Sequence, residues 1–342
     1  MQLRRRALLT MPLAAGFAAT AQAQSADWAR LLETANQQGH LVILHNVPPP
    51  MGDLWLAEFH KAFPKIDVEA TRLGSSELMQ RFSTEYAAGV SQTDVAITLW
   101  DDTLTKWQKD GWIRTFAPPE AAAFPEQYKR DNQIYTLQLI RAGMVSNKAR
   151  IRDADAPKEW TDFFDAKWKG KIGMDPPWRS VAVQEMLALW DRLGIKDVAK
   201  RLKANNVRFF NGSAGVIQAV IRGDIQVAAV IEPPVISALA DGAPIRIIFP
   251  ASGVPAIATC AFLPAKAPHP EVGMLFLNWA LSQPGQQSLQ DIGGAAVVRP
   301  GIGAPKLVPG VSDMKIVLST DLLTPDNQKV IIDEWRSVFG LQ

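Results

Sequence analysis

The sequence predicts an α/β protein of two domains, each with a mainly parallel sheet flanked by helices. Short apolar runs alternate with longer amphipathic runs, which is the arrangement of consecutive βα units. A length of 342 residues suits two domains that each bury a core of their own. The composition, 47% hydrophobic and 20% charged, is that of an ordinary globular protein, so two such cores are within reach.

The predicted strands are short apolar runs that end in polar or proline-bearing loops. Residues 41–44 read Leu-Val-Ile-Leu, which indicates a strand buried on both faces of its sheet. Residues 227–231 have the same character and lead into Glu232 and two prolines. The predicted strands are 41–44, 66–70, 95–99, 134–139, 142–145, 172–174, 207–210, 227–231, 245–249 and 256–262.

The predicted helices are the amphipathic runs between these strands, and several carry start signals. A serine, Ser75 or Ser76, is a natural N-cap for the predicted helix 77–88. Pro270 stands in the first turn of a later helix, and Thr324 with Pro325 begins the last one. The predicted helices are 27–38, 53–63, 77–88, 104–110, 181–193, 195–205, 214–222, 270–281 and 326–339.

The first 23 residues have the composition of a secretory signal peptide. Three arginines precede an apolar run, and Ala21-Gln22-Ala23 forms a small-x-small cleavage site, so we expect cleavage near Ala23 and a periplasmic product. Removing those arginines changes the formal net charge from +2 to −1, which leaves no basic field for nucleic acid or an anionic membrane. Cys260 is the only cysteine, so no intrachain disulfide can form.

The stretch from Trp160 to Ser180 is the sequence's best candidate for a binding site. A brief strand leads through a loop with Trp178 and Arg179 to a helix that begins after Ser180. A helix N-terminus offers unpaired N–H groups and a positive dipole end, which together with an arginine suit a small anion. Ligands of open α/β sheets lie beyond the carboxyl ends of the strands. The candidate ligand-binding residues, all in such loops, are His45, Asn46, Ser75, Ser76, Trp100, Asp101, Trp178, Arg179, Ser180, Ser213 and Glu232.

These candidates have different expected roles, each weighed against an ordinary structural one. Arg179 would pair with the anionic group, because a guanidinium matches carboxylate and phosphate geometry. Trp100 and Trp178 would supply apolar walls, or would simply pack into a core or hinge. Glu232 would bind a ligand amine, or would form an ion pair between the lobes, and the residue types leave both open. Each serine at a helix start, taken alone, is more typical of a plain helix cap than of a contact with a ligand.

Several segments taken in order resemble a known family. They include residues 41–44, 74–78, 93–97, 145–148, 157–173, 223–225 and 282–287. The chain is similar to the substrate-binding proteins of bacterial ABC importers, in the ferric-iron-binding branch of the type II periplasmic binding proteins. This resemblance implies two lobes joined by two crossing strands, near residues 139–145 and 255–262. It implies lobe 1 from 24–139 and 256–342 and lobe 2 from 140–255. It further implies hinge closure on a solute by a monomer that delivers to an ABC permease in the inner membrane.

One departure from that branch decides the expected ligand. Ferric-binding members place adjacent tyrosines after the strand that corresponds to 227–231, whereas this chain has Pro233 and Pro234 there. Hard Fe(III) without phenolates would be poorly held, so we predict a small organic anion such as a carboxylate, phosphonate or phosphorylated metabolite, with no metal or cofactor. A metal site from His45, Asp101, Asp102 and Glu232 is the alternative. No G-x-S-x-G, P-loop or H-E-x-x-H motif favours a secreted enzyme.

Overall fold

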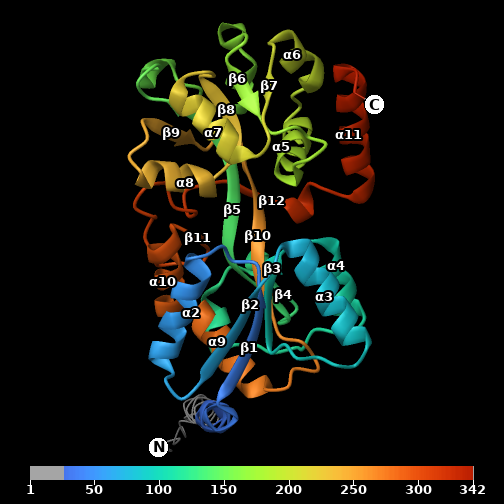
Figure 1. Cartoon of the computed structure of the whole chain (residues 1–342), viewed down its shortest axis with the longest axis vertical. Coiled ribbons are helices and arrows are strands. Elements are labelled where there is room, and N and C mark those ends of the chain that lie inside the picture. Colours follow the sequence, from blue (N-terminus) through green and yellow to red (C-terminus); the bar gives the residue numbers. More distant parts are fainter. Residues whose placement is uncertain (1–26, 342) are drawn as a thin grey trace, which may run out of the picture.

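Two α/β lobes joined by a pair of long strands make up the computed structural model, which describes residues 27–341 (Figure 1). The joining strands are β5 (Ile134–Asn147) and β10 (Val254–Phe262), which run antiparallel to each other. Both pass from one lobe into the other, so a single sheet path continues through the junction. The predicted two-lobed α/β fold with two crossing strands is confirmed. The predicted signal peptide, residues 1–23, lies outside the described residues.

Lobe 1 is built on the strands β1 (His40–His45), β2 (Asp67–Arg72) and β3 (Val95–Leu99). The strand β1 pairs in parallel with β2 and with β3, and β10 closes the set by pairing antiparallel with β3. The carboxyl ends of the three parallel strands therefore meet at one edge. A helix over residues 27–38 precedes β1 as predicted. The labelled helices of this lobe are α2 (Met51–Ala62), α3 (Ser75–Ala87), α4 (Asp102–Lys109), α9 (Pro270–Leu281) and α10 (Gln283–Gly293).

Lobe 2 repeats this design around the other half of β5. The strand β8 (Val227–Ile231) pairs in parallel with β6 (Ile172–Met174), which pairs in parallel with β7 (Arg208–Phe209). The strands β8 and β9 (Ile245–Ile248) both pair antiparallel with β5. The helices here are α5 (Val181–Arg192), α6 (Val198–Ala204), α7 (Ser213–Arg222), α8 (Pro233–Ala240) and α11 (Pro325–Phe339).

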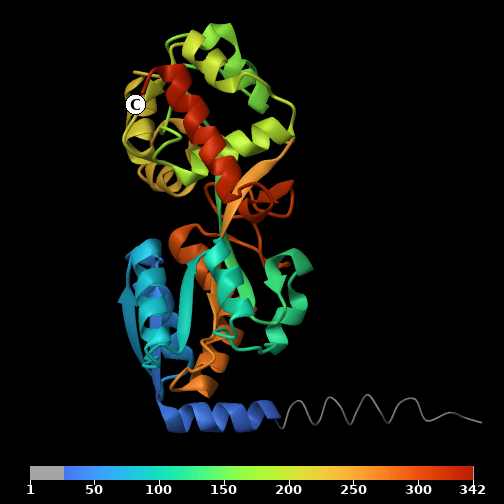
Figure 2. The ribbon, with the colours of Figure 1, turned by 90° about the vertical axis from the view of Figure 1, so that its right-hand side faces the viewer.

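The last helix packs with lobe 2, although the sequence interpretation placed all of 256–342 in lobe 1. Trp335 of α11 is 2% exposed and belongs to the same apolar cluster as the helix α5. It stacks on Phe339 and meets the edge of Phe209 on β7. Figure 2 shows the red C-terminal helix along the upper lobe. The amphipathic pattern of this helix predicts that one face is buried, but it contains no information on which lobe buries it.

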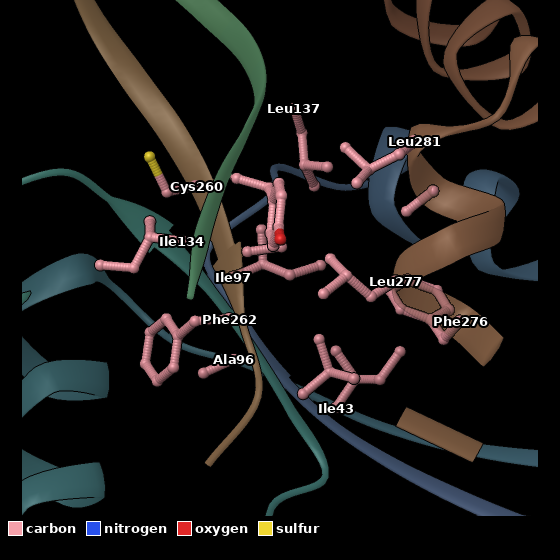
Figure 3. Packing of buried hydrophobic residues seen from close by; sticks show 14 of the residues in the cluster. Ile43, Ala96, Ile97, Ile134, Leu137, Cys260, Phe262, Phe276, Leu277 and Leu281 are labelled. Carbon is pink, nitrogen blue, oxygen red and sulfur yellow. The ribbon is translucent and has the colours of Figure 1, made fainter. Parts of the chain in front are cut away.

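The core of lobe 1 lies between its sheet and the helix α9 (Figure 3). Ile43 and Ile97 from two strands lie on the same side of the sheet as Phe276 and Leu277 from the helix, and all four are at most 1% exposed. Phe262 lies on the opposite face, where it packs against Phe82 and Trp107. Burying side chains of this size supplies roughly 1.5–3 kcal/mol each, which is the main stabilisation available without a disulfide. Cys260 is buried in the same core, and burial raises the pKa of its thiol to about 12. The thiol is therefore protonated and unreactive at neutral pH.

Other differences from the predicted elements are local. The strand β5 is continuous over 14 residues where the sequence predicted two strands. The sequence placed residues 232–234 in a loop after the strand 227–231, but Pro233 and Pro234 occupy the first turn of α8, where a missing N–H does no harm. The remaining short elements are β4 (Lys129–Arg130), β11 (Ala296–Val297), β12 (Ile316–Leu318), η1 (Pro119–Ala123), η2 (Glu126–Tyr128), η3 (Asp153–Asp155), η4 (Trp160–Phe164), η5 (Ala166–Trp168) and η6 (Ser319–Asp321). Within the described ranges, no helix is long and apolar enough to cross a bilayer.

Candidate functional site

The loops after β1 and β2 bring two predicted site residues together on lobe 1. The side-chain amide of Asn46 donates to the hydroxyl of Ser75 at 2.8 Å, across 29 residues of sequence. Neither Ser75 nor Ser76 is the N-cap of α3, so that prediction is wrong: Gly74 holds the position in extended backbone. Within the described residues no side chain bonds to the first-turn N–H groups of α3, so these donors point out from the helix unpaired.

His45 lies under the first turn of α2 instead of projecting from its loop. The residue is 3% exposed, and a side chain at Gly52 would come within 2.9 Å of its ring. Burial lowers the pKa of His45, and nearby Arg72 adds to this while Asp53 opposes it. The ring is therefore neutral at pH 7. Its Nδ1 atom has no hydrogen-bond partner among residues 27–341, and its packing suits a buried support for the loop better than a contact with solute.

The loop after β3 is occupied with local structure. The carboxylate of Asp101 accepts from the backbone N–H of Thr103 at 2.7 Å and so caps α4. Trp100 lies under the guanidinium of Arg130, whose central carbon is 4.1 Å from the ring centroid. Trp100 and Asp101 also line a pocket of about 110 Å³ to which lobe 2 contributes Val181. Trp100 thus combines the two roles considered for it, as a packed residue and as a wall between the lobes.

On lobe 2, the loops after β6 and β7 converge. Arg179 donates to the side-chain oxygen of Asn211 at 3.3 Å, and the hydroxyl of Ser213 donates to Asp175 at 2.8 Å. Asp175 was missed in the sequence, although it directly follows the last residue of β6 inside the stretch already singled out. Burial raises the pKa of Asp175, while hydrogen bonds from Ser213 and from the backbone of Gly212 lower it. Ser213 is therefore bonded to this acid and does not cap α7, whose N-cap is Gly212.

Ser180 and Trp178 complete this loop with structural roles. The hydroxyl of Ser180 accepts from the N–H of Val183 at 3.4 Å, so its predicted cap of α5 is confirmed. Trp178 meets the edge of Phe209 with ring centroids 5.1 Å apart, at the border of the lobe 2 core. The packing role considered for Trp178 is therefore the one found. Arg179, between these two anchored residues, is exposed, and its bond to Asn211 is its link to the neighbouring loop.

The two serines that follow these loops allow a direct test of capping. We expect Ser180→Ala to lower the free energy of unfolding by about 1 kcal/mol, because α5 loses its side-chain acceptor. Ser76→Ala is the matched control and should change it by less than about 0.5 kcal/mol, because no capping bond is lost in α3. Urea unfolding followed by tryptophan fluorescence measures both. Equal effects of the two substitutions would contradict this assignment of caps.

Glu232 is taken up by an ion pair, so its predicted contact with a ligand amine is not the arrangement found. Its carboxylate binds the guanidinium of Arg141 through two bonds, one of them from Nε at 2.7 Å. Their side chains are 2% and 0% exposed. Arg141 also donates to the carbonyl oxygens of Pro309 at 2.8 Å and Gly310 at 3.4 Å. The pair therefore joins the crossing strand β5, the start of α8 and the C-terminal segment. It is an ion pair, but both partners lie within 140–255 and not on opposite lobes as the alternative to the amine expected.

The residues of the alternative metal site do not come together. His45 is packed under α2, Asp101 caps α4 and Glu232 is bound to Arg141. Across the described part of the chain, no cluster of three or more His, Cys, Asp and Glu side chains could hold a metal ion. What the fold does assemble is a pair of polar clusters, one per lobe: Asn46 with Ser75, and Arg179 with Asn211.

Comparison with known proteins agrees with this architecture. Residues 47–287 match the family of bacterial extracellular solute-binding proteins. A probable ABC transporter periplasmic-binding protein of Sinorhizobium fredii, y4fP, is 27% identical over 118 residues, which are 34% of this chain and only 32% of that relative.

Two solved structures have the same fold at low identity. Iron-bound HitA from Pseudomonas aeruginosa has 18% identity and a TM-score of 0.69, with 87% of this chain and 99% of that one covered. The periplasmic binding protein AfuA from Actinobacillus pleuropneumoniae, with fructose-6-phosphate bound, has 19% identity and a TM-score of 0.66, covering 89% and 99%. These likenesses show a type II periplasmic binding protein fold. Because the family match spans more than half of the sequence, the chain belongs to the bacterial extracellular solute-binding proteins.

Proposed function

We propose that this protein is the periplasmic component of an ABC importer and captures a small organic anion between its two lobes. The signal peptide would direct export and be cleaved near Ala23, and the loaded monomer would deliver its solute to a permease of the inner membrane. Family membership supports solute binding without chemical change. The relatives include an iron-bound and a sugar-phosphate-bound protein, so the choice of an anion rests on this chain's own residues.

The observation that carries the proposal is the convergence of Arg179 and Asn211 at the start of α5 and α7. These two side chains meet at 3.3 Å from loops 32 residues apart, at the carboxyl ends of parallel strands. Ser180 caps α5. At the start of α7 the N–H of Gly212 donates to Asp175, and within the described residues no side chain at the N-cap bonds to the N–H groups that follow. A guanidinium beside unpaired helix N–H groups is a favourable environment for a carboxylate, phosphonate or phosphate.

Lobe 1 supplies a second set of hydrogen-bond donors for the anionic group of the solute. The helix α3 begins at Ser75 with its first N–H groups unbonded by side chains in residues 27–341, and Asn46 stands beside it. Among residues 27–341, only β5 and β10, with the C-terminal segment, connect the lobes, so rotation about these strands would bring the two sets together around the solute. Pro233 and Pro234, where ferric-binding relatives carry phenolates, favour an anion over Fe(III) in this gap.

Arg179→Ala tests the role of the guanidinium. We expect affinity for an anionic solute to fall at least tenfold, because the charge-assisted hydrogen bonds to the anion are lost. Calorimetric titration with carboxylates, phosphonates and sugar phosphates, begun from whatever anion mass spectrometry finds in the purified native protein, measures the effect.

Arg192→Ala is the control, since this arginine lies in the last turn of the same helix. It should leave affinity within about twofold. Equal affinities of the two variants, or a co-purified solute that is cationic or neutral, would contradict the proposal.

A further inference from the structure

A large apolar pocket lies between the two lobes, beside the crossing strands. Its volume is about 760 Å³, within the range of roughly 300–1,000 Å³ common for small-molecule sites. Lobe 1 contributes the run Pro48–Met51 and the end of α10, and lobe 2 contributes the first turns of α8. The segment 303–308 closes a third side. These elements surround the junction on the side of α2, α8 and α10 in Figure 1.

The walls of this pocket are poorly suited to a bare ion or a heavily hydroxylated solute. Prolines Pro48, Pro49, Pro50 and Pro233 carry no N–H, so they provide no backbone donors to an anion. Ile236 and the 45%-exposed Leu307 add aliphatic surface. A solute that placed oxygen atoms against these walls would lose hydrogen bonds to water and gain none in return.

The polar side chains of the pocket are already bonded to the protein. The hydroxyl of Ser237 donates to the carbonyl of Pro233 at 3.4 Å. The amide of Gln287 donates to Asp291 at 3.2 Å, and that of Gln290 to the carbonyl of Gly303 at 2.9 Å. Lys306 is exposed, and its ammonium forms no salt bridge with the residues described. The pocket therefore combines apolar walls with two exposed charges, the ammonium of Lys306 and the carboxylate of Asp291.

We propose that this pocket binds the apolar body of the transported solute, which is an organic acid with an aliphatic or aromatic moiety. The inference rests on the proposed function and names its substrate class. Asn46 precedes Pro48 by two residues, so the lobe 1 donors and the apolar wall belong to one loop. Lys306 adds attraction for the negative group. A body that removes apolar surface of both lobes from water favours the closed state, because the buried apolar area stabilises that state relative to the open one.

Titration with a graded set of solutes tests this inference. The acids are acetate, hexanoate, benzoate and 4-phenylbutyrate, and the comparisons are benzamide, 4-phenylbutyramide and glucose 6-phosphate. We expect 4-phenylbutyrate to bind the full-length mature protein at least tenfold more tightly than acetate and than its own amide. Binding is measured by calorimetry, with intrinsic tryptophan fluorescence as a second readout.

Two variants place the binding in this pocket. Ile236→Asp, which sets a carboxylate in the wall, should lower affinity for 4-phenylbutyrate at least tenfold, and Ser237→Trp should do so by filling the space. Leu54→Asp is the control: this 50%-exposed residue lies on α2 outside the pocket lining and should leave affinity within twofold. Thermal unfolding of each variant, compared with the unsubstituted protein, separates lost binding from lost folding.

The outcomes distinguish this inference from the proposed function. If acids bind without regard to their apolar body, or if Ile236→Asp and Ser237→Trp bind as the unsubstituted protein does, the pocket assignment is wrong. If glucose 6-phosphate binds and none of the four acids does, the inference falls while an anion-binding function stands. If the amides bind as tightly as their acids, the anion-binding function itself is contradicted.

Discussion

Glu232→Ala is expected to lower the free energy of unfolding by about 3–5 kcal/mol, because it leaves Arg141 buried without its counter-charge. The guanidinium is fully buried, and two of its nitrogens face the lost carboxylate. Its remaining bonds, to the carbonyls of Pro309 and Gly310, do not neutralise the charge. Burial raises the pKa of Glu232 and the ion pair lowers it again, so the carboxylate depends on Arg141 as much as the reverse.

Urea unfolding of three further variants tests the ion pair. Asp333→Ala breaks the exposed pair with Lys329 and should cost less than about 1 kcal/mol. Arg141→Met with Glu232→Leu should recover much of the lost stability, because no buried charge remains unpaired. If Glu232→Ala instead changed the free energy of unfolding by less than about 1 kcal/mol and abolished solute binding, the ion-pair role would be contradicted and the contact with a ligand amine would be supported.

Glu185→Gln is expected to make the protein's stability less dependent on pH between about 4.5 and 8. Glu185 of α5 is 2% exposed, and burial raises the pKa of its carboxyl from 4.5 to about 8, against a smaller lowering by a hydrogen bond from Ser319. Below pH 4.5 this group is protonated in both the folded and the unfolded protein. Between the two values only the unfolded protein loses the proton, so stability falls as pH rises and levels off above pH 8.

The size of this effect has an upper bound of about 5 kcal/mol, since each pH unit between the folded and unfolded pKa values corresponds to 1.36 kcal/mol. Unfolding by urea at pH 5, 6.5 and 8 measures it. The advantage of Glu185→Gln over the unsubstituted protein should grow steadily along this series. Glu334→Gln, on the exposed face of α11, is the control and should show no such trend. A constant difference between Glu185→Gln and the unsubstituted protein at all three pH values would contradict the assignment.

Patterns that depend on neighbouring residues were sufficient to predict most of the elements. The apolar runs at 41–44 and 227–231 lie inside β1 and β8, because a strand buried on both faces needs apolar side chains at every position. Ser180 caps α5 as predicted, since a hydroxyl reaches an N–H group three residues on whatever the rest of the fold does. The placing of candidate residues in strand-end loops followed from the same local reading.

Contacts between distant residues account for what the sequence did not predict. The side chain of Asn46 bonds to Ser75 because the loop after β1 lies beside the loop after β2. Gly74, and not Ser75 or Ser76, occupies the N-cap position of α3. Asp175 was overlooked because its partner Ser213 is 38 residues away. Alternation along a strand predicts on which face of the sheet a side chain lies, but it does not predict which residue of another element packs against it.

The sequence patterns by themselves determined the α/β class, the absence of an intrachain disulfide and the loops in which polar residues gather, and the resemblance to a known family implied the two crossing strands. Only the tertiary structure decided that Glu232 belongs to Arg141, that α11 belongs to lobe 2 and that prolines wall a pocket between the lobes. The physical reason is the sequence separation over which each kind of interaction acts. Periodicity and capping act over a few residues, whereas the pairing of two charges 91 residues apart depends on how whole strands and helices pack.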